Sequence, residues 1–263
     1  MHKIDYDHEL NRNYHTVEGA QHMLSTLWAG NVPTSVLDIG CGSGTWMRAA
    51  QSLGTSDVFG IDGVDLTQSA LHVPKELIRT ADLNKPIQLG RQFDLVISME
   101  TAEHLEPESS GNLIQSLVDH GSTVLFSAGV PGQGGTHHVN CHWPSYWQNL
   151  FNDHGFICDD WIRWAVWKDN LIEPWYRQNA FVARKGEGAG SEPRIKGIIH
   201  PDMLPTFSHV FYDEHLRSIE SGALSTMWYA TTPIKAIRAK LRKRTLHLAA
   251  RKSLDARSDA RNQ

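Results

Sequence analysis

The chain has 263 residues, 40% of them hydrophobic and 21% charged, and a formal net charge of −4 at pH 7. This length suits one substantial core with an appendage, and no apolar run reaches the roughly 18 residues of a membrane span. Residues 1–13 are polar and give no sign of a secretory signal. Three cysteines without paired spacing favour reduced thiols over a disulfide framework. We therefore expect a cytoplasmic globular protein.

The first predicted elements are a helix, a strand and a glycine turn. Residues 16–28 carry apolar side chains at helical spacing, and residues 36–39 have the length and branching of a buried strand. Glycines then alternate at positions 40, 42 and 44, which permits positive φ angles and close approach of a ligand to the backbone. Residues 47–53 favour a helix. Strand, glycine turn and helix form the ligand-binding unit of many α/β sheets.

The glycine spacing narrows the class of ligand. Thr45 stands where a dinucleotide fingerprint needs its third glycine, and the Gly-Lys-Ser/Thr of a phosphate loop is absent. The remaining pattern, Asp-x-Gly-x-Gly-x-Gly, resembles motif I of the class I S-adenosylmethionine-dependent methyltransferases. The resemblance implies S-adenosylmethionine as cofactor and a set of residues around its methionine part: Asp38, Gly40, Cys41, Gly42 and Gly44.

Further expected cofactor residues follow the next two predicted strands. Residues 57–62 form the second strand, whose terminal Asp62 would accept hydrogen bonds from the ribose hydroxyls. The acid three residues later is the alternative, because a glycine blurs where this strand stops. A third short strand over 76–81 precedes Asp82 and Leu83, which the resemblance places at the adenine.

A fourth predicted strand leads into an acidic segment. Residues 93–98 suit a strand buried on both faces, and we expect Ser98 and Met99 at its end to contact the cofactor. The next residues, Glu100 to Leu105, resemble the Glu-x-x-Glu-His-Leu segment of many methyltransferases, including ubiquinone-pathway and sugar O-methyltransferases.

The predicted catalytic residues are histidines near this edge of the sheet. Methyl transfer to an alcohol needs a base, and a neutral imidazole suits that role. His104 follows the fourth strand, and His138 lies in a glycine-rich loop after a fifth strand over 122–127. We predict His138 as the base ahead of His104, with Glu103 completing the catalytic set. The alternative for His104 is a structural histidine at a helix start, paired with a carboxylate.

The same residues suggest a metal-assisted alternative. Glu100, Glu103 and His104, with His138 or His142, resemble the metal ligands of methyltransferases that modify the 3′-terminal ribose 2′-hydroxyl of small RNAs. A magnesium or manganese ion would acidify that hydroxyl. Because the segment is widespread in metal-free relatives and the later histidine pattern matches only in part, we predict no metal site and do not favour a nucleic-acid substrate.

Residues 136–176 are rich in histidine and aromatic side chains. We expect a helix over 145–152, a sixth strand over 156–165 and a final strand over 178–184. Residues near the proposed site are predicted to contact the substrate: His137, His142, Trp143, Tyr146 and Trp147. Residues 175–177 would close the other side of the site. The alternative is that these rings form the core of a cap over the sheet. The run resembles a group of bacterial and phage methyltransferases and indicates no substrate.

The C-terminal part differs in composition. Residues 187–197 suit a linker between a domain over 1–186 and an extension over 198–263. Residues 235–252 hold eight lysines or arginines and no acid, with apolar residues spaced for a basic amphipathic helix. Such a helix could bind anionic lipid, nucleic acid or a partner protein.

These observations predict an α/β fold with a seven-stranded Rossmann-like methyltransferase sheet, flanking helices and a C-terminal basic helical tail. By family resemblance the last strand runs antiparallel. The predicted function is O-methylation of a sugar or glycan hydroxyl with a histidine base, in the cytoplasm or at the inner membrane face. The alternatives are the metal-assisted RNA ribose methyltransferase and a non-catalytic cofactor-binding module that partners an enzyme.

Overall fold

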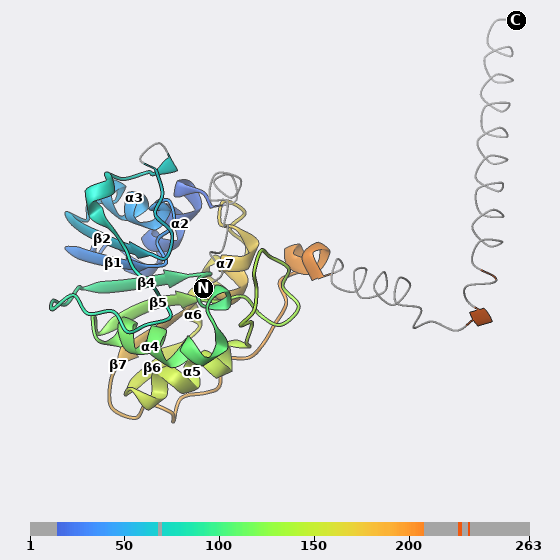
Figure 1. The fold of residues 1–263 in the computed structure, drawn as a ribbon. Helices are drawn as coiled ribbons and strands as arrows, with labels where there is room; N and C mark the ends of the chain where they lie inside the picture. The colour runs from blue at the N-terminus through green and yellow to red at the C-terminus, as the bar shows by residue number, and fades with distance from the viewer. Residues whose placement is uncertain (1–14, 68–69, 208–225, 228–230, 232–263) are drawn as a thin grey trace, which may run out of the picture. The chain divides into compact units, whose positions relative to one another are not determined.

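The computed structural model describes residues 15–67, 70–207, 226–227 and 231. The chain divides into two compact units, Met1–Val210 and Phe211–Gln263, and the sheet belongs to the first. Seven strands pair in the order β3-β2-β1-β4-β5-β7-β6 (Figure 1). Their bounds are β1 (Ser35–Ile39), β2 (Asp57–Asp62), β3 (Ile78–Thr80), β4 (Leu95–Met99), β5 (Thr123–Ser127), β6 (Phe156–Asp159) and β7 (Phe181–Lys185).

The direction of the strands confirms the predicted fold class. Neighbouring strands from β3 to β5 are parallel, whereas β7 runs antiparallel to both β5 and β6. The last strand in the sequence is therefore an inner strand of the sheet. This is the α/β, Rossmann-like sheet that the sequence predicted, including its antiparallel last strand.

Helices cover both faces of the sheet. The α-helices are α2 (Val17–Trp28), α3 (Thr45–Ser52), α4 (Ser110–Val118), α5 (Pro144–Asp153), α6 (Trp161–Val166) and α7 (Pro174–Asn179). Short 3₁₀ turns are η2 (Lys75–Leu77), η3 (Ala102–His104), η4 (Pro107–Ser109) and η5 (Pro201–Met203). Apolar residues of α2, α3, α6 and α7 join one core cluster, and those of α4 and α5 join another.

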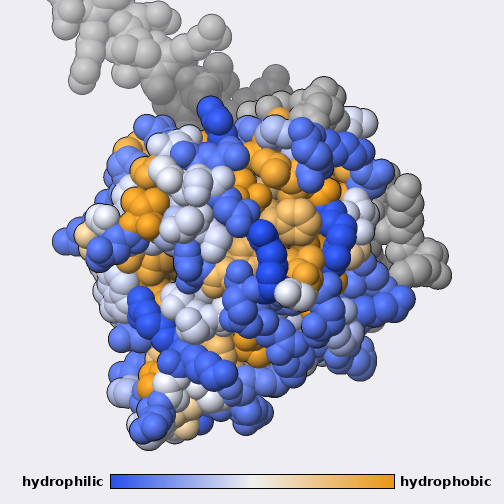
Figure 2. Space-filling view, turned by 90° about the vertical axis from the view of Figure 1, so that its left-hand side faces the viewer, coloured by the Kyte–Doolittle hydropathy of each residue, from blue (hydrophilic) through white to orange (hydrophobic). Residues whose placement is uncertain are grey.

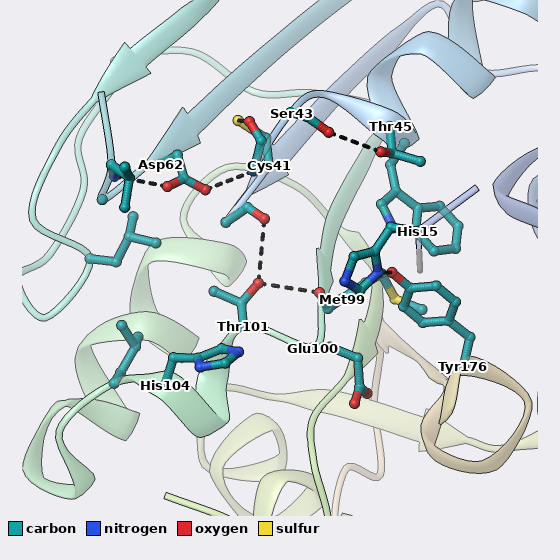
Figure 3. Close-up of a pocket in the computed structure, with 17 residues that line it drawn as sticks. His15, Cys41, Ser43, Thr45, Asp62, Met99, Glu100, Thr101, His104 and Tyr176 are labelled. Carbon is teal, nitrogen blue, oxygen red and sulfur yellow. Dashed lines mark hydrogen bonds between the residues drawn. The ribbon is translucent and has the colours of Figure 1, made fainter. Parts of the chain in front are cut away.

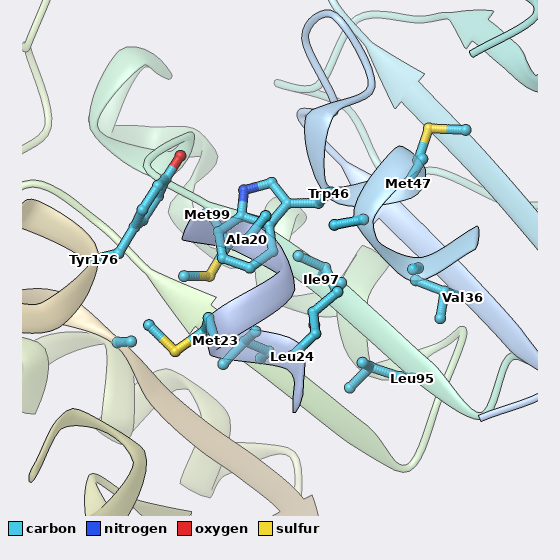
Figure 4. Packing of buried hydrophobic residues seen from close by; sticks show 14 of the residues in the cluster. Ala20, Met23, Leu24, Val36, Trp46, Met47, Leu95, Ile97, Met99 and Tyr176 are labelled. Carbon is cyan, nitrogen blue, oxygen red and sulfur yellow. The ribbon is translucent and has the colours of Figure 1, made fainter. Parts of the chain in front are cut away.

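Alternation along the strands separates these two clusters. Leu95 and Ile97 of β4 belong to the first cluster and Val96 to the second, because successive side chains of a strand point to opposite faces. Figure 4 shows the first cluster, in which Met23 and Leu24 of α2 are buried. On the face shown in Figure 2, hydrophobic residues are exposed in small groups among hydrophilic ones.

The first helix forms as the sequence predicted. The Thr16 hydroxyl accepts a hydrogen bond from the Gly19 N–H at 3.0 Å, which caps the start of α2. Ala29, with φ 46°, ends the helix in the left-handed conformation. Between these caps, the buried face of α2 follows the helical spacing of its apolar residues.

Two predicted strands were wrong in extent. The strand expected over 156–165 ends at Asp159, whose carboxylate accepts a hydrogen bond from the Trp161 N–H at 2.8 Å and opens α6. Ile162 and Val166, four residues apart, are buried on one helical face. The strand expected over 178–184 starts only at Phe181, because α7 occupies the preceding residues.

The residues expected to form a linker pack on the first unit. We call residues 187–203 the C-terminal strap. The Glu192 carboxylate accepts hydrogen bonds from the side chains of Asn152 and Gln148, at 2.6 and 3.0 Å, and the His200 N–H donates to the Gln178 side chain at 2.8 Å. The first compact unit runs to residue 210.

No helix in the part of the chain that the structure describes is long and apolar enough to cross a membrane. The predicted basic helix over residues 235–252 lies outside the described residues.

Candidate functional site

A pocket lies at the carboxyl ends of β1, β2 and β4 (Figure 3). The turn after β1 supplies one part of its wall, Asp62 at the end of β2 another, and residues 99–101 at the end of β4 a third. In open α/β sheets, ligands bind outside the carboxyl ends of the strands where neighbouring connections diverge. The strand order places that point between β1 and β4.

The turn after β1 can be made only with glycine. Gly40 and Gly44 have φ angles of 84° and 82°, values that residues with a side chain rarely adopt. A Cβ atom on Gly40 would collide with the Thr101 side chain, and one on Gly44 would lie 2.7 Å from a methyl carbon of Val73. The backbone of this turn therefore approaches the pocket without side chains in between.

Asp62 is fixed at the wall by backbone donors. Its Oδ2 accepts a hydrogen bond from the Gly42 N–H at 2.7 Å, and its Oδ1 accepts one from the Val64 N–H at 2.9 Å. A carboxylate has lone pairs beyond these two contacts, so it can accept further hydrogen bonds from a ligand. Asp65, the alternative considered from sequence, instead forms an ion pair with Lys75 at 2.7 Å.

The predicted cofactor residues divide into two groups. Those in the pocket wall are Gly40, Cys41, Gly42, Asp62, Leu83 and Met99. Asp38 and Ser98 lie beneath the wall and are buried, and Gly44 caps the start of α3. Burial, followed by the charge of Asp62, raises the pKa of Asp38 well above its usual value. Asp82 accepts hydrogen bonds from Asn84 and thereby closes its own turn.

Glu100 lies at the other end of the pocket from Asp62 (Figure 3). Its Oε2 accepts a hydrogen bond from the Gln133 side chain at 2.7 Å, and its Oε1 accepts one from Asn179 at 3.1 Å. Burial raises the pKa of this carboxyl. From sequence Glu100 was considered only as a metal ligand, because nothing in the sequence indicates that Gln133 and Asn179 converge on it.

An aromatic group closes the wall beside Glu100. The Tyr176 hydroxyl lies 2.6 Å from His15 Nδ1, and its ring is 5.0 Å from the Trp46 ring, edge to face. The sequence suggested that residues 175–177 close the site, and Tyr176 does line the pocket. Arg177 points elsewhere and pairs with Asp202 at 2.9 Å. His15 and Trp46 were not predicted, and no sequence signal ties His15 to this wall.

The two predicted base histidines are in ring contact. The centroids of His104 and His138 are 4.9 Å apart, with the rings nearly perpendicular. Burial, followed by the proximity of His138, lowers the pKa of His104 to about 4, and burial lowers that of His138 as well. Both rings are therefore neutral near pH 7. His104 lines the pocket and His138 does not; His138 Nδ1 donates to the Gln133 carbonyl at 3.1 Å.

Glu103 lies behind His104 and is completely buried. Neither of its carboxyl oxygens has a hydrogen-bond partner among the described residues. Burial, followed by the charge of Glu100, raises its pKa well above the usual value. One ligand atom each from Glu103, His104 and His138 lies within 4.8 Å of the others, a spacing that could hold a cation.

None of the five predicted substrate residues lines the pocket: His137, His142, Trp143, Tyr146 and Trp147. Trp147 is 1% exposed and packs against Phe126 in the core, which leaves no surface for a substrate. His142 stacks on Tyr146 with ring centroids 3.8 Å apart. For Trp147, the alternative made from sequence, that these rings form the core of a cap over the sheet, agrees better with the structure.

The chain is similar in sequence to known methyltransferases. A family model described as a methyltransferase domain matches residues 6–158. Ribosomal protein L11 methyltransferase of Laribacter hongkongensis (strain HLHK9) is 35% identical over 96 residues, which are 35% of this chain and 32% of that protein. The chain thus spans about a third of the length of this curated relative.

Two solved structures are similar to this chain. The sugar N-methyltransferase KedS8 from Streptoalloteichus sp ATCC 53650 superposes with a TM-score of 0.52 at 13% identity, over 68% of this chain and 91% of that one. Streptomyces venezuelae DesVI gives a TM-score of 0.49 at 15% identity, over 69% of this chain and 100% of that one.

Proposed function

Because the chain belongs to the methyltransferase domain family and is a class I S-adenosylmethionine-dependent methyltransferase, we propose that it methylates a hydroxyl group of a sugar or glycan. The observation that carries the proposal is that the two ends of this pocket differ in chemistry. One end has the glycine turn and Asp62, and the other has a neutral imidazole, His104, beside polar groups.

The residues of the first end fit the cofactor. The turn at Gly40 brings bare backbone to the pocket, and the oriented Asp62 carboxylate can accept hydrogen bonds from ribose hydroxyls. Leu83 offers an apolar contact for the adenine. We therefore assign the methionine part to the glycine turn, the ribose to Asp62 and the adenine to Leu83.

The acceptor end supplies a proton acceptor. When bound, S-adenosylmethionine would supply an electrophilic methyl carbon on a positively charged sulfur, and the electrons of the broken C–S bond would stay on that sulfur. The acceptor oxygen forms the new bond with a lone pair, and its proton passes to the imidazole of His104. A base with a pKa of about 4 suffices, because the hydroxyl proton becomes strongly acidic as the oxygen bonds to carbon.

Replacement of His104 tests this role. His104→Ala should lower kcat by about 10²–10⁴-fold, the contribution typical of a general base, while the affinity for S-adenosylmethionine changes little. His142→Ala, outside the pocket wall, is the control and should keep full activity. His138→Ala measured alongside identifies which ring accepts the proton. Turnover of both His104→Ala and His138→Ala within a few-fold of wild type would exclude a histidine base.

A second candidate is a metal-assisted RNA ribose 2′-O-methyltransferase. The cluster of Glu103, His104 and His138 favours it, because a carboxylate and two imidazoles suit a divalent ion that acidifies a hydroxyl. Added manganese should then raise methylation of the 3′-terminal ribose of a small RNA, and a chelator should abolish it. Indifference to both would exclude this function.

The basic tail gives a separate proposal about location. Residues 235–252 lie outside the described residues, yet their eight basic side chains without an acid suit an anionic surface. Each such charge contributes about 1 kcal/mol near an anionic membrane. The full chain should float with phosphatidylglycerol vesicles and a chain ending at Tyr229 should not. Equal flotation of the two would exclude membrane binding through the tail.

A further inference from the structure

Glu100 has an unusual backbone conformation at the end of β4. Its φ angle is 49°, in the left-handed region that favours glycine, and its N–H donates to the carbonyl and hydroxyl oxygens of Ser127 at 3.1 and 3.0 Å. Unfavourable conformations of this kind persist where the surroundings fix them and concentrate at functional sites. Glu100, which adopts this conformation, is part of the pocket wall.

Two amide side chains from different parts of the chain hold that carboxylate. Gln133, in the loop after β5, donates to Oε2, and Asn179 at the end of α7 donates to Oε1 at 3.1 Å and to Oε2 at 3.3 Å. Asn179 also donates to Gln133 Oε1 at 3.0 Å, so the three side chains form one network. Because these donors come from separate segments of the chain, they fix the position of the Glu100 carboxylate in the pocket wall.

The part of the pocket wall that the structure describes gives Glu100 no lysine or arginine as a partner. Among the described residues, its wall contains the acids Asp62 and Glu100 and no lysine or arginine. Glu103, completely buried, has a pKa raised well above its usual value by burial and by the charge of Glu100, so it adds no charge that would need a partner. Buried charges in proteins are normally paired, so a positive group on a ligand would complete this arrangement.

We propose that Glu100 binds an ammonium group of the methyl acceptor, which makes the substrate class an amino sugar methylated on a hydroxyl beside its amine. The inference rests on the proposed function and adds the acceptor's charge to it. Asp62 and the glycine turn occupy the end assigned to the cofactor, whereas His104 and Tyr176 lie at the end with Glu100. One N–H of the ammonium would donate a hydrogen bond to the Glu100 carboxylate.

The sulfonium of the cofactor is the other cation that Glu100 could face, and binding measurements separate the two. S-adenosylhomocysteine lacks that positive charge but is otherwise the same ligand. Calorimetry measures the dissociation constants of both ligands for wild type, Glu100→Gln and the exposed control Glu108→Gln. For each ligand, we expect the constants of the three proteins to agree within about twofold. A loss of about tenfold or more for S-adenosylmethionine alone in Glu100→Gln would overturn the proposal.

Substrate preference tests the ammonium directly and needs no variant. Wild type is given labelled S-adenosylmethionine and matched methyl glycosides of glucose, galactose and mannose, each with a hydroxyl, an amine or an acetamide at carbon 2. We expect kcat/KM for the amines to exceed that for their partners by about tenfold or more. Glu100→Gln should remove the preference mainly through KM, and Glu108→Gln should retain it.

The outcomes of this assay distinguish the two proposals. Equal methylation of the amine and hydroxyl members of each pair would overturn the role of Glu100 and leave the sugar hydroxyl function in place. Failure to methylate any glycoside would overturn the proposed function, and the amino-sugar inference with it. A preference for amines that persists unchanged in Glu100→Gln would overturn the assignment to this residue.

Discussion

Asp62 shows at the level of one side chain how the strand end prepares a ligand contact. Two backbone N–H groups orient its carboxylate before any ligand arrives, so little side-chain freedom is lost on binding. The rival acid, Asp65, is instead mostly exposed beside Lys75. Of these two carboxylates, three residues apart, only that of Asp62 is therefore oriented to bind a ligand in the pocket.

Asp62→Asn should weaken S-adenosylmethionine and S-adenosylhomocysteine equally, because both carry the same ribose. Hydrogen bonds to a charged group contribute about 1.5–3 kcal/mol, which corresponds to a loss of about 10–150-fold in affinity. Calorimetry measures both constants. Asp65→Asn serves as the control and should stay within about twofold of wild type. A larger loss in the control than in Asp62→Asn would move the ribose contact to Asp65.

Gly40 differs from another glycine of similar backbone conformation only in its surroundings. Gly30 has a φ of 92° and no atom within 4 Å of a Cβ placed on it, whereas a Cβ on Gly40, with a φ of 84°, would meet Thr101. Both alanine variants carry the cost of the left-handed conformation, about 1–2 kcal/mol. Overpacking should lower the free energy of unfolding of Gly40→Ala by about 1–3 kcal/mol more than that of Gly30→Ala. Urea unfolding measures both losses. Equal losses in the two would show that the turn relaxes freely.

At the scale of elements, a single carboxylate of the strap, that of Glu192, links α5 to β6 by hydrogen bonds. Glu192 accepts hydrogen bonds from Gln148 and Asn152 of α5 and from the backbone N–H of Cys158 in β6. Burial opposes ionisation, but these donors outweigh it and lower the pKa of Glu192 to about 2. The folded state therefore favours the charged form.

Glu192→Gln should lower the free energy of unfolding at pH 7 by about 1–2 kcal/mol, allowing for solvent screening. Because the folded-state pKa lies below the unfolded one, the contribution is present above about pH 4.5 and is lost as pH falls toward 2. Urea unfolding of both proteins across this range measures it. Glu187→Gln, an exposed acid in the same strap, is the control. A difference that is constant with pH would exclude an ionic origin.

Elements with a clear local pattern were predictable, and those set by tertiary contacts were not. The sequence located β1, β2 and the glycine turn because short branched runs bounded by glycine have few other conformations. It placed Trp161 and Ile162 in a strand because a short apolar run suits either element, and the hydrogen bond from the Trp161 N–H to the Asp159 carboxylate at the start of α6 is known only from the fold. Of the candidate site, the motif residues were found, whereas the grouping of His15, Glu100 and Tyr176 required the fold.

At the scale of the whole molecule, every wall residue of the main pocket belongs to the first compact unit. A chain ending at Val210 should therefore melt cooperatively at the temperature of the full chain and bind S-adenosylmethionine with the same affinity. A chain ending at Gly190 loses Glu192, Ile195 and His200, and should melt about 4 °C or more lower. Calorimetry of the three proteins measures both properties. Equal melting of the two truncated chains would show that the strap contributes no stability.

The position of β7 has a consequence for how the protein is made on the ribosome. This strand is translated last among the seven, yet it pairs on one side with β5 and on the other with β6. Until it leaves the exit tunnel, the nascent sheet carries an open edge at β5, and β6 has no neighbour. A pause in translation before residue 181 would hold the chain in this aggregation-prone state, so we expect slow synthesis at that point to lower the yield of folded protein.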